Sequence, residues 1–300
     1  MNICCKCRET LIDAKGLYGL HENCFMEWFG LSILDEFSEI IPRSQSQVPM
    51  ENLEKNTTFF HGAFRKYSSR LGKDTYILKV IQLQYPELQA TEFLCNQIYE
   101  NLGIKIPNYY LIRFPEDHFC FVTKNFMSRL LNSSLVHIYH YLKTRDDHNC
   151  EKLVTVIGEN TGRRTEQERF VYLTLADSLI GNHDRHGRNL GFIQSPKGMC
   201  LAPFYDNPSY IGLEDDLMLG ADLQPSGAIS TKETNEPKMR DYVFEWNRLG
   251  YGNVVQRFQK KFSFHSIKQL VESSWISQKR QNALIRLITK RGNELCDNIK

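Results

Sequence analysis

Long hydrophobic runs are missing from this sequence. No stretch approaches the roughly 20 apolar residues that a helix needs to cross a bilayer. The first residues, 1–7, also lack the extended apolar core of a signal peptide. We therefore expect a cytoplasmic protein that has no membrane partner.

Neither positive nor negative charge is in clear excess. The 300 residues include 37 Lys and Arg against 35 Asp and Glu. Because opposite charges nearly balance, the whole chain has no electrostatic attraction for nucleic acid, and we expect no direct nucleic-acid partner. Internal repeats and low-complexity runs are also absent, and 41% of the residues are hydrophobic. This profile indicates one large folded domain or two close-packed lobes.

The nine cysteines lack the spacing of a disulfide framework. Their number is odd, and those after residue 90 are scattered through apolar or helical segments. We expect the following to be reduced and mostly buried thiols: Cys95, Cys120, Cys150, Cys200 and Cys296.

Residues 1–30 hold the other cysteines. Cys4 and Cys7 are followed by His21 and Cys24, and these two pairs have the ligand types and the spacing of a small zinc site. Cys5 is an alternative ligand. A structural Zn²⁺ is therefore one interpretation, and a reduced cap that packs on the C-terminal lobe without a metal is the other. In either case the aromatic residues that follow, at 25–29, need a partner surface.

Composition divides the chain into three parts. Residues 1–55 form a Cys/His-containing segment with a polar linker, residues 56–126 a small sheet-plus-helix lobe, and residues 127–300 a mostly helical lobe. In the small lobe we expect two strands within 67–81 that are joined by a tight turn, a helix over 86–102, and strands over 109–114 and 119–124. In the helical lobe the periodicity predicts helices over 134–142, 166–180, 240–249, 254–262 and 278–296.

The segment GNHDRHGRNLGF at residues 181–192 is the most informative one. It follows an apolar helix and leads into two apolar strands that the turn formers at 195–198 separate, which is the pattern of a hairpin. A hairpin brings its two ends together. Asp184 and Asn189 at its entry should therefore lie near Asp206 at its exit, so that two carboxylates and an amide converge.

Such a convergence is what phosphoryl transfer requires. One carboxylate accepts the proton of the substrate hydroxyl, while an Asn and a second Asp hold magnesium ions on the phosphates. The spacing of Asp184 and Asn189 equals that of the protein-kinase catalytic loop. Alone this pattern is weak, because Asp and Asn also cap helices and form turns.

Lys79 is a second candidate, because it lies in the middle of an otherwise apolar strand. A buried lysine needs a partner, and Glu92 on the next helix is the expected one. In kinases such a pair holds the α and β phosphates of the nucleotide. The alternative is a solvent-facing lysine on an edge strand, with Glu92 on an open helical face.

These segments together resemble the HipA-type kinases, and among them the short HipT-like forms. The resemblance rests on TYILK at 75–79, ATE at 90–92, LIGNHDRHGRN at 179–189 and LAPFYD at 201–206. It runs from about residue 60 to the C terminus. It implies an α+β fold that is two-lobed and protein-kinase-like, with a small sheet-plus-helix N-lobe and a mostly helical C-lobe. It also implies a Mg-ATP-dependent serine/threonine kinase that acts as a bacterial toxin.

The resemblance also implies partners. An aminoacyl-tRNA synthetase is the implied protein substrate, and a small antitoxin protein the implied inhibitor. The site roles that the family pattern implies are a catalytic base at Asp184, magnesium ligands at Asn189 and Asp206, and a phosphate anchor at Lys79.

Further roles follow from the same resemblance. Residues 122–126, with Thr123 and Lys124, would form the hinge that faces adenine. His186 would contact substrate or phosphate, and a loop histidine bonded to backbone is its alternative role. Asp177, in the preceding helix, would brace the catalytic loop by hydrogen bonding.

The chain departs from the family in the phosphate loop. The family pattern Ser-x-Ser-Gly-x-Gln-x-Lys is replaced by FFHGAFRK at residues 59–66, which keeps Gly62 and Lys66 and loses the serines and the glutamine. Gly62 would let the backbone approach phosphates, although a glycine in an ordinary turn is an equal alternative. Regulation by phosphorylation of loop serines is not expected.

Two other interpretations of the whole chain stay open. One is a kinase for a lipid or small molecule, and the other is a catalytically inactive nucleotide-binding scaffold.

Overall fold

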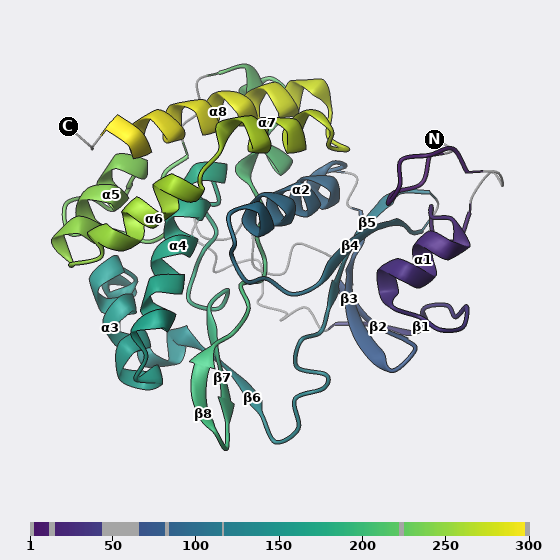
Figure 1. Cartoon of the computed structure of the whole chain (residues 1–300), viewed down its shortest axis with the longest axis horizontal. Helices are drawn as coiled ribbons and strands as arrows, with labels where there is room; N and C mark the ends of the chain where they lie inside the picture. The colour runs from purple at the N-terminus through teal and green to yellow at the C-terminus, as the bar shows by residue number, and fades with distance from the viewer. Residues whose placement is uncertain are drawn as a thin grey trace, which may run out of the picture. The chain divides into compact units, whose positions relative to one another are not determined.

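The structure is a computed structural model, and it describes residues 3–11, 16–43, 66–81, 84–115, 117–221 and 225–297. The chain separates into two compact units. Unit 1 comprises Met1–Phe93 and Pro107–Arg129, and unit 2 comprises Leu94–Ile106 and Leu130–Lys300. Unit 1 is built on a sheet and unit 2 is mostly helical, so the predicted α+β class with a sheet lobe and a helical lobe is confirmed (Figure 1). Among the described residues no helix is both long and apolar enough to span a membrane.

Unit 1 contains a five-stranded antiparallel sheet in the order β1-β2-β3-β5-β4. Its strands are β1 (Ser38–Pro42), β2 (Lys66–Leu71), β3 (Asp74–Lys79), β4 (Tyr109–Arg113) and β5 (Phe119–Lys124). The predicted turn at 71–74 is confirmed, because Leu71 pairs with Asp74 around Gly72, whose φ is 57°. The two later strands were predicted as well. Strand β1 was not predicted, because it is short, is exposed at every position and lacks the alternation of a half-buried strand.

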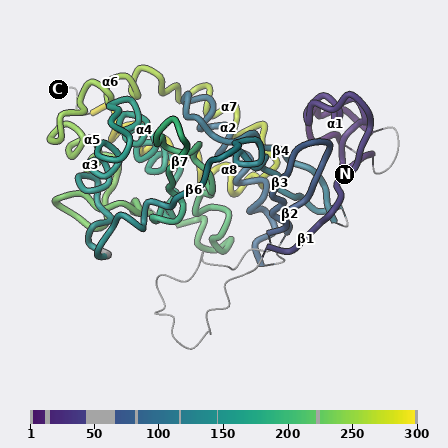
Figure 2. The backbone as a smooth tube through the Cα atoms, turned by 90° about the horizontal axis from the view of Figure 1, so that it is seen from below, coloured from purple at the N-terminus to yellow at the C-terminus, as the bar shows by residue number. Residues whose placement is uncertain are grey.

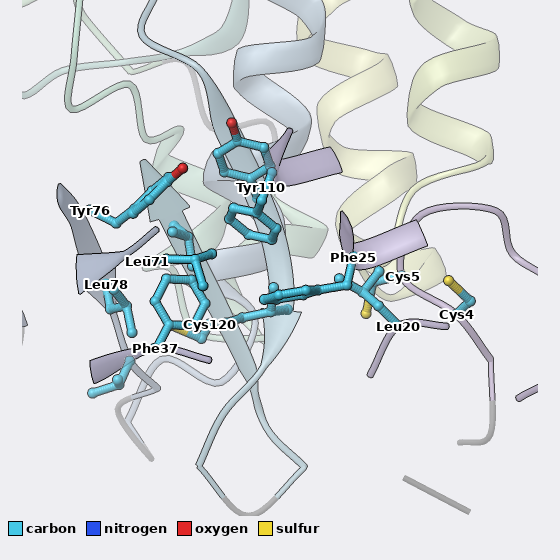
Figure 3. Close-up of a cluster of buried hydrophobic side chains, with 14 of the residues drawn as sticks. Cys4, Cys5, Leu20, Phe25, Phe37, Leu71, Tyr76, Leu78, Tyr110 and Cys120 are labelled. Atoms are coloured by element: carbon cyan, nitrogen blue, oxygen red, sulfur yellow. The ribbon is translucent and has the colours of Figure 1, made fainter. Parts of the chain in front are cut away.

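One face of this sheet is covered by the short helix α1 (Glu22–Phe29) (Figure 1). The buried rings of Phe25 and Phe29 pack with sheet residues in one apolar cluster, part of which Figure 3 shows. The rings of Phe29 and Tyr110 stack with their centroids 4.1 Å apart. The aromatic residues at 25–29 thus find the partner surface that they need. Helix α2 (Leu88–Asn101), which the sequence predicted, follows β3.

Unit 2 is organised around helix α4 (Arg164–Ile180), whose residues 173–180 are all buried. The other α-helices of the unit are α3 (Cys150–Thr161), α5 (Met239–Arg248), α6 (Gly252–Lys261), α7 (Phe264–Glu272) and α8 (Gln278–Cys296). Helix α4 contacts α3, α5, α6 and α8, so it has no solvent face in its second half. Helices α7 and α8 lie side by side (Figure 1 and Figure 2). Four of the helices predicted for this part of the chain are confirmed, and α3 and α7 were missed.

A small antiparallel sheet completes unit 2, in the order β6-β7-β8. Strands β7 (Gly191–Ser195) and β8 (Gly198–Leu201) form the predicted hairpin. The helix predicted over 134–142 is wrong, because this segment contains strand β6 (Ser134–His137) and then the short 3-10 helix η2 (Ile138–Tyr141). Leu135, Ile138 and Leu142 recur at helical spacing, but β6 gains hydrogen bonds by pairing with β7. Tertiary pairing thus overrides the local pattern.

Candidate active site

The predicted catalytic loop begins where α4 ends. Gly181 ends the helix with a φ of 72°, in the left-handed conformation that favours glycine. A Cβ atom at this position would approach side-chain atoms of Tyr210, Leu287 and Pro225 to less than 3.0 Å. Only glycine therefore fits both the backbone and the space at this turn, which directs residues 182–189 away from the helix axis.

Asp177, in the last turns of α4, is the acceptor that holds this loop. Its carboxylate accepts hydrogen bonds from Nδ2 of Asn182 at 2.8 Å and from Nε of Arg185 at 2.9 Å. The hydroxyl of Tyr99 donates to the same carboxylate. Burial raises the pKa of Tyr99 well above its ordinary value, and the nearby charge of Asp177 acts in the same direction, so the phenol keeps the proton that it donates. The predicted bracing of the loop by Asp177 is therefore present.

Arg185 joins the catalytic loop to the segment that carries Asp206. One terminal nitrogen of its guanidinium donates to the backbone carbonyl of Asn189 at 3.2 Å and to that of Tyr205 at 2.8 Å. The other donates to Oδ1 of Asn207 at 2.6 Å. A single buried side chain thus fixes the residue at one end of the hairpin and both neighbours of Asp206 at the other.

The electrostatics of Arg185 favour this role. Burial alone would lower the pKa of the guanidinium, but the charge and hydrogen bonds of Asp177 raise it above its ordinary value. The side chain of Asn207 also donates to Oδ1 of Asn96 at 2.7 Å, which ties the network to the second half of α2. The sequence interpretation missed Arg185, Asn207 and Asn96 as members of the site.

Asp184 and Asn189 lie in direct contact, as predicted. Nδ2 of Asn189 donates to the backbone carbonyl of Asp184 at 3.0 Å and lies 3.4 Å from Oδ2 of its carboxylate. Because the amide nitrogen faces Asp184, the orientation of the amide and hence the place of its oxygen are fixed.

His186 is bonded to backbone, in agreement with its alternative role. Its Nδ1 accepts a hydrogen bond from the backbone N–H of Arg188 at 3.1 Å, so in a neutral ring Nε2 carries the proton. Nε2 lies 3.7 Å from Oδ1 of Asp184. This distance is longer than a hydrogen bond, and the contact of His186 with substrate or phosphate stays a prediction.

Asp206 has a φ of 53°, in the left-handed region that Asp and Asn tolerate better than most residues. The preceding Tyr205 places its hydroxyl 3.2 Å from Nδ1 of His137 and 3.2 Å from the carbonyl of Arg188. Burial raises the pKa of Tyr205, and the negative charge of Asp206 raises it further. Asp206 is thus tied to the catalytic loop through Arg185 and through Tyr205.

In unit 1, Nζ of Lys79 lies 2.5 Å from Oε1 of Glu92. The exposed fractions of the two side chains are 12% and 5%, so the predicted ion pair is confirmed and the solvent-facing alternative is wrong. Lys79 lies in an inner strand, opposite Lys66 on one side and Phe121 on the other. Residues directly opposite each other in an antiparallel pair share a face of the sheet. Lys66 and Lys79 are therefore on one face, and Gly62 lies outside the described residues.

The two hinge candidates have partners within unit 1. Thr123 donates its hydroxyl hydrogen to the carbonyl of Asn108 at 3.3 Å. Nζ of Lys124 lies 2.6 Å from Oδ2 of Asp74, and Nε of Arg129 lies 2.5 Å from the other oxygen of that carboxylate. The structure thus shows a charged cluster that the sequence did not indicate, and the contact of Thr123 and Lys124 with adenine stays a prediction.

The predicted cysteine and histidine cluster converges in unit 1. The potential ligand atoms of Cys4, Cys7, His21 and Cys24 all lie within 4.8 Å of one another. Cys5 is not among them, although it belongs to the same apolar cluster as Cys4. Cys4 and Cys24 pack with the apolar cluster of the unit 1 sheet, so a metal-free reduced cap would belong to this sheet and not to the C-terminal lobe.

Comparisons with known proteins identify the family and the fold of this chain. The model of the HipA-like C-terminal domain matches residues 53–275. The kinase CtkA of Helicobacter pylori shares the fold with a TM-score of 0.63 and 18% identity, over 77% of this chain and 91% of that one. HipA of Shewanella oneidensis MR-1, in a complex with HipB and operator DNA, has a TM-score of 0.58 and 15% identity, over 86% of this chain and 71% of that one. No curated protein sequence matches the chain. Since the domain model matches well over half of the residues, the chain belongs to the HipA-like C-terminal domain family.

Proposed function

We propose that this protein is a Mg-ATP-dependent serine/threonine protein kinase, and that it is the toxin of a HipA/HipT-type toxin–antitoxin module. The observation that carries the proposal is the bonding of Arg185. Its guanidinium holds the loop of Asp184 and Asn189 together with the segment of Asp206. A buried network of this kind keeps three oxygen-bearing side chains in fixed positions, which preorganised phosphoryl transfer requires.

The three side chains have distinct roles in the proposal. Asp184 accepts the proton of the attacking hydroxyl, and Nε2 of His186 lies near its carboxylate. Asn189 and Asp206 hold magnesium. Amide and carboxylate oxygens are the ligands that Mg²⁺ prefers, so the donor set suits this ion. Bound Mg-ATP supplies the phosphoryl group and the charge that neutralises its oxygens.

Lys79 and Lys66 form the proposed phosphate anchor. They lie directly opposite each other in β2 and β3, so both are on one face of the sheet. Two ammonium groups on one face attract the negative charges of a polyphosphate, and Glu92 holds the ammonium group of Lys79. The arrangement therefore supports a nucleotide as the ligand of this face of the sheet, with Gly62, Thr123 and Lys124 as further contacts.

Partners are proposed from the family. HipA of Shewanella oneidensis MR-1 forms a complex with HipB. We expect a small antitoxin protein to bind this chain in a similar way. The proposed substrate is a component of translation such as an aminoacyl-tRNA synthetase, and the proposed site of action is the bacterial cytoplasm.

The experiment that tests the function is a transfer assay. Purified wild type, Asp184→Asn and the control Glu159→Gln are incubated with γ-labelled ATP, Mg²⁺ and a bacterial extract. Glu159 is an exposed residue of α3 and makes a matched carboxylate-to-amide control. The proposal predicts a labelled protein band with wild type and Glu159→Gln and its loss with Asp184→Asn. Mass spectrometry of the band then identifies the acceptor residue.

Two outcomes would overturn the proposal. A labelled small product in place of a protein band would identify a kinase for a lipid or small molecule. No label above background, together with measurable ATP binding, would identify an inactive nucleotide-binding scaffold.

A further inference from the structure

We propose that Cys4, Cys7, His21 and Cys24 bind one structural zinc ion that fastens helix α1 to the sheet of unit 1. Sγ of Cys7 lies 3.4 Å from Nδ1 of His21, and Sγ of Cys24 lies 3.8 Å from the same atom. In a tetrahedral site with Zn–S near 2.3 Å and Zn–N near 2.0 Å, ligand atoms are about 3.5–3.8 Å apart. These two distances are close to those of a formed zinc site, and all four ligand atoms lie within 4.8 Å of one another.

The histidine is oriented for this role by a neighbouring carbonyl. Nε2 of His21 lies 3.1 Å from the backbone oxygen of Thr10, to which its N–H donates. This bond fixes the tautomer and leaves Nδ1 as the acceptor that faces Cys7 and Cys24. Zinc-binding histidines are held in the same way, because the ring nitrogen that does not bind the metal donates to an oxygen.

The ligands come from two local turns. Cys4 accepts a backbone hydrogen bond from Arg8 at 3.1 Å and donates one to Glu9 at 2.8 Å, which closes the first turn around Cys7. His21 is the N-cap of α1 but forms no side-chain cap there, and Cys24 lies in the first turn of the helix. A metal bound to all four ligands would therefore tie the first turn to the start of α1.

Cys5 is excluded as a fifth candidate by the position of its thiol. Cys4 and Cys5 are both buried and belong to the same apolar cluster as Leu20 and Phe25 (Figure 3), so burial does not distinguish them. The sulfur of Cys4 lies within 4.8 Å of the other potential ligand atoms, whereas Cys5 is not a member of that group. Cys4 is therefore the ligand at the edge of the core, and Cys5 acts as a small apolar side chain.

Helix α1 is too short to be stable without contacts to the rest of unit 1. It has 8 residues, fewer than the 12–15 below which an isolated helix is marginal in water. It nevertheless carries Phe25 and Phe29, which cover the sheet face formed in part by Tyr76 and Leu78. Successive strand residues point to opposite faces, so Lys79 lies on the other face of this sheet. Loss of the metal would uncover the apolar face behind the proposed phosphate anchor.

The first test is the metal content of the full chain. Wild type, Cys7→Ser, Cys24→Ser and the control Cys296→Ser are purified under reducing conditions without chelator, and zinc is measured by plasma mass spectrometry. Cys296 is an exposed thiol near the end of α8, far in sequence from the cluster. We expect one zinc per chain in wild type and Cys296→Ser and at least a tenfold lower content in the two ligand variants. Removal of zinc should lower the Tm of wild type by roughly 5 °C or more.

A titration with Co²⁺ keeps the test independent of whether the variants fold. Metal-free wild type should bind one equivalent and develop the absorption of tetrahedral, thiolate-bound cobalt, and Zn²⁺ should displace it. The proposal is overturned if reduced wild type neither retains zinc nor gives this spectrum. It is also overturned if soluble Cys7→Ser binds the metal as wild type does. The kinase assay is not part of this readout, so failure here leaves the proposed function untouched.

Discussion

Nε of Arg185 donates a hydrogen bond to Oδ2 of Asp177 at 2.9 Å, and both side chains are almost fully removed from solvent. Charges that are buried this deeply are costly unless they are paired and hydrogen-bonded. Here the arginine also donates to three acceptors in the segments of the proposed site. The pair therefore links the stability of unit 2 to the geometry of the proposed site.

Replacing Arg185 should destabilise the protein strongly. Arg185→Met leaves Asp177 buried without its counter-charge, and breaking a buried pair costs about 3–5 kcal/mol. Urea denaturation, followed by circular dichroism, measures the free energy of unfolding. The surface control Arg240→Ala, in α5, should stay within about 0.5 kcal/mol of wild type. A loss below about 1 kcal/mol in Arg185→Met would show that the pair does not organise the unit.

Phosphoryl transfer should require the negative charge of Asp206 and not only its backbone conformation. Its φ of 53° is tolerated by Asn and Gly, so Asp206→Asn and Asp206→Gly both remove the charge without added strain. We expect each to lower the transfer rate by at least about 100-fold at fixed Mg²⁺ while the Tm changes little. Rates are measured with γ-labelled ATP. Wild-type rates in either variant would remove Asp206 from the magnesium site.

Lys79 should have separable roles in stability and activity. Lys79→Met leaves Glu92 buried without its partner, whereas the double variant Lys79→Met/Glu92→Gln removes both charges. The double variant should therefore recover most of the Tm that the single variant loses. Activity should stay at least about 100-fold below wild type in both, because the phosphate anchor is gone. Recovery of activity together with the Tm would indicate a purely structural pair.

Low pH should lower the folding stability of unit 1, because the carboxylate of Asp74 becomes protonated. Burial raises the pKa of this carboxyl, but the hydrogen bonds and charges of Lys124 and Arg129 outweigh burial and lower it below its ordinary value. A group with a depressed folded-state pKa contributes stability above its unfolded pKa, and this contribution is lost as the pH falls through the folded pKa. Asp74→Asn should thus be less stable than wild type at pH 7, and the difference should shrink below about pH 4. Urea denaturation at several pH values checks this, and a gap that widens in acid would contradict it.

Much of the fold could be predicted because local signals agree with the tertiary structure. The turn at Gly72, the apolar periodicity of α8 and the turn formers between β7 and β8 each specify a local conformation. Strand β6 was misread because its helical spacing of apolar residues is compatible with a strand once β7 is available to pair with it. Only the folded chain provides that partner.

The functional side chains of the candidate site could be predicted from the sequence, but the residue that holds them in place could not. Asp184 and Asn189 stand in a recognisable spacing, and the pairing of Lys79 with Glu92 follows from the cost of burying a lone charge. The role of Arg185 was not visible, because its acceptors lie 4 to 22 residues away along the chain. An arginine in a loop between two apolar segments is the one signal that could have indicated a buried pair.

The proposed kinase depends above all on phosphoryl transfer by the loop that Arg185 holds. ATP binding and transfer of the γ-phosphoryl group from Mg-ATP should be measured side by side for wild type and Asp184→Asn. We expect equal ATP affinity within about threefold and a transfer rate at least about 100-fold lower in the variant. Equal transfer rates, with both proteins folded, would overturn the proposed role of Asp184 and the kinase built on it.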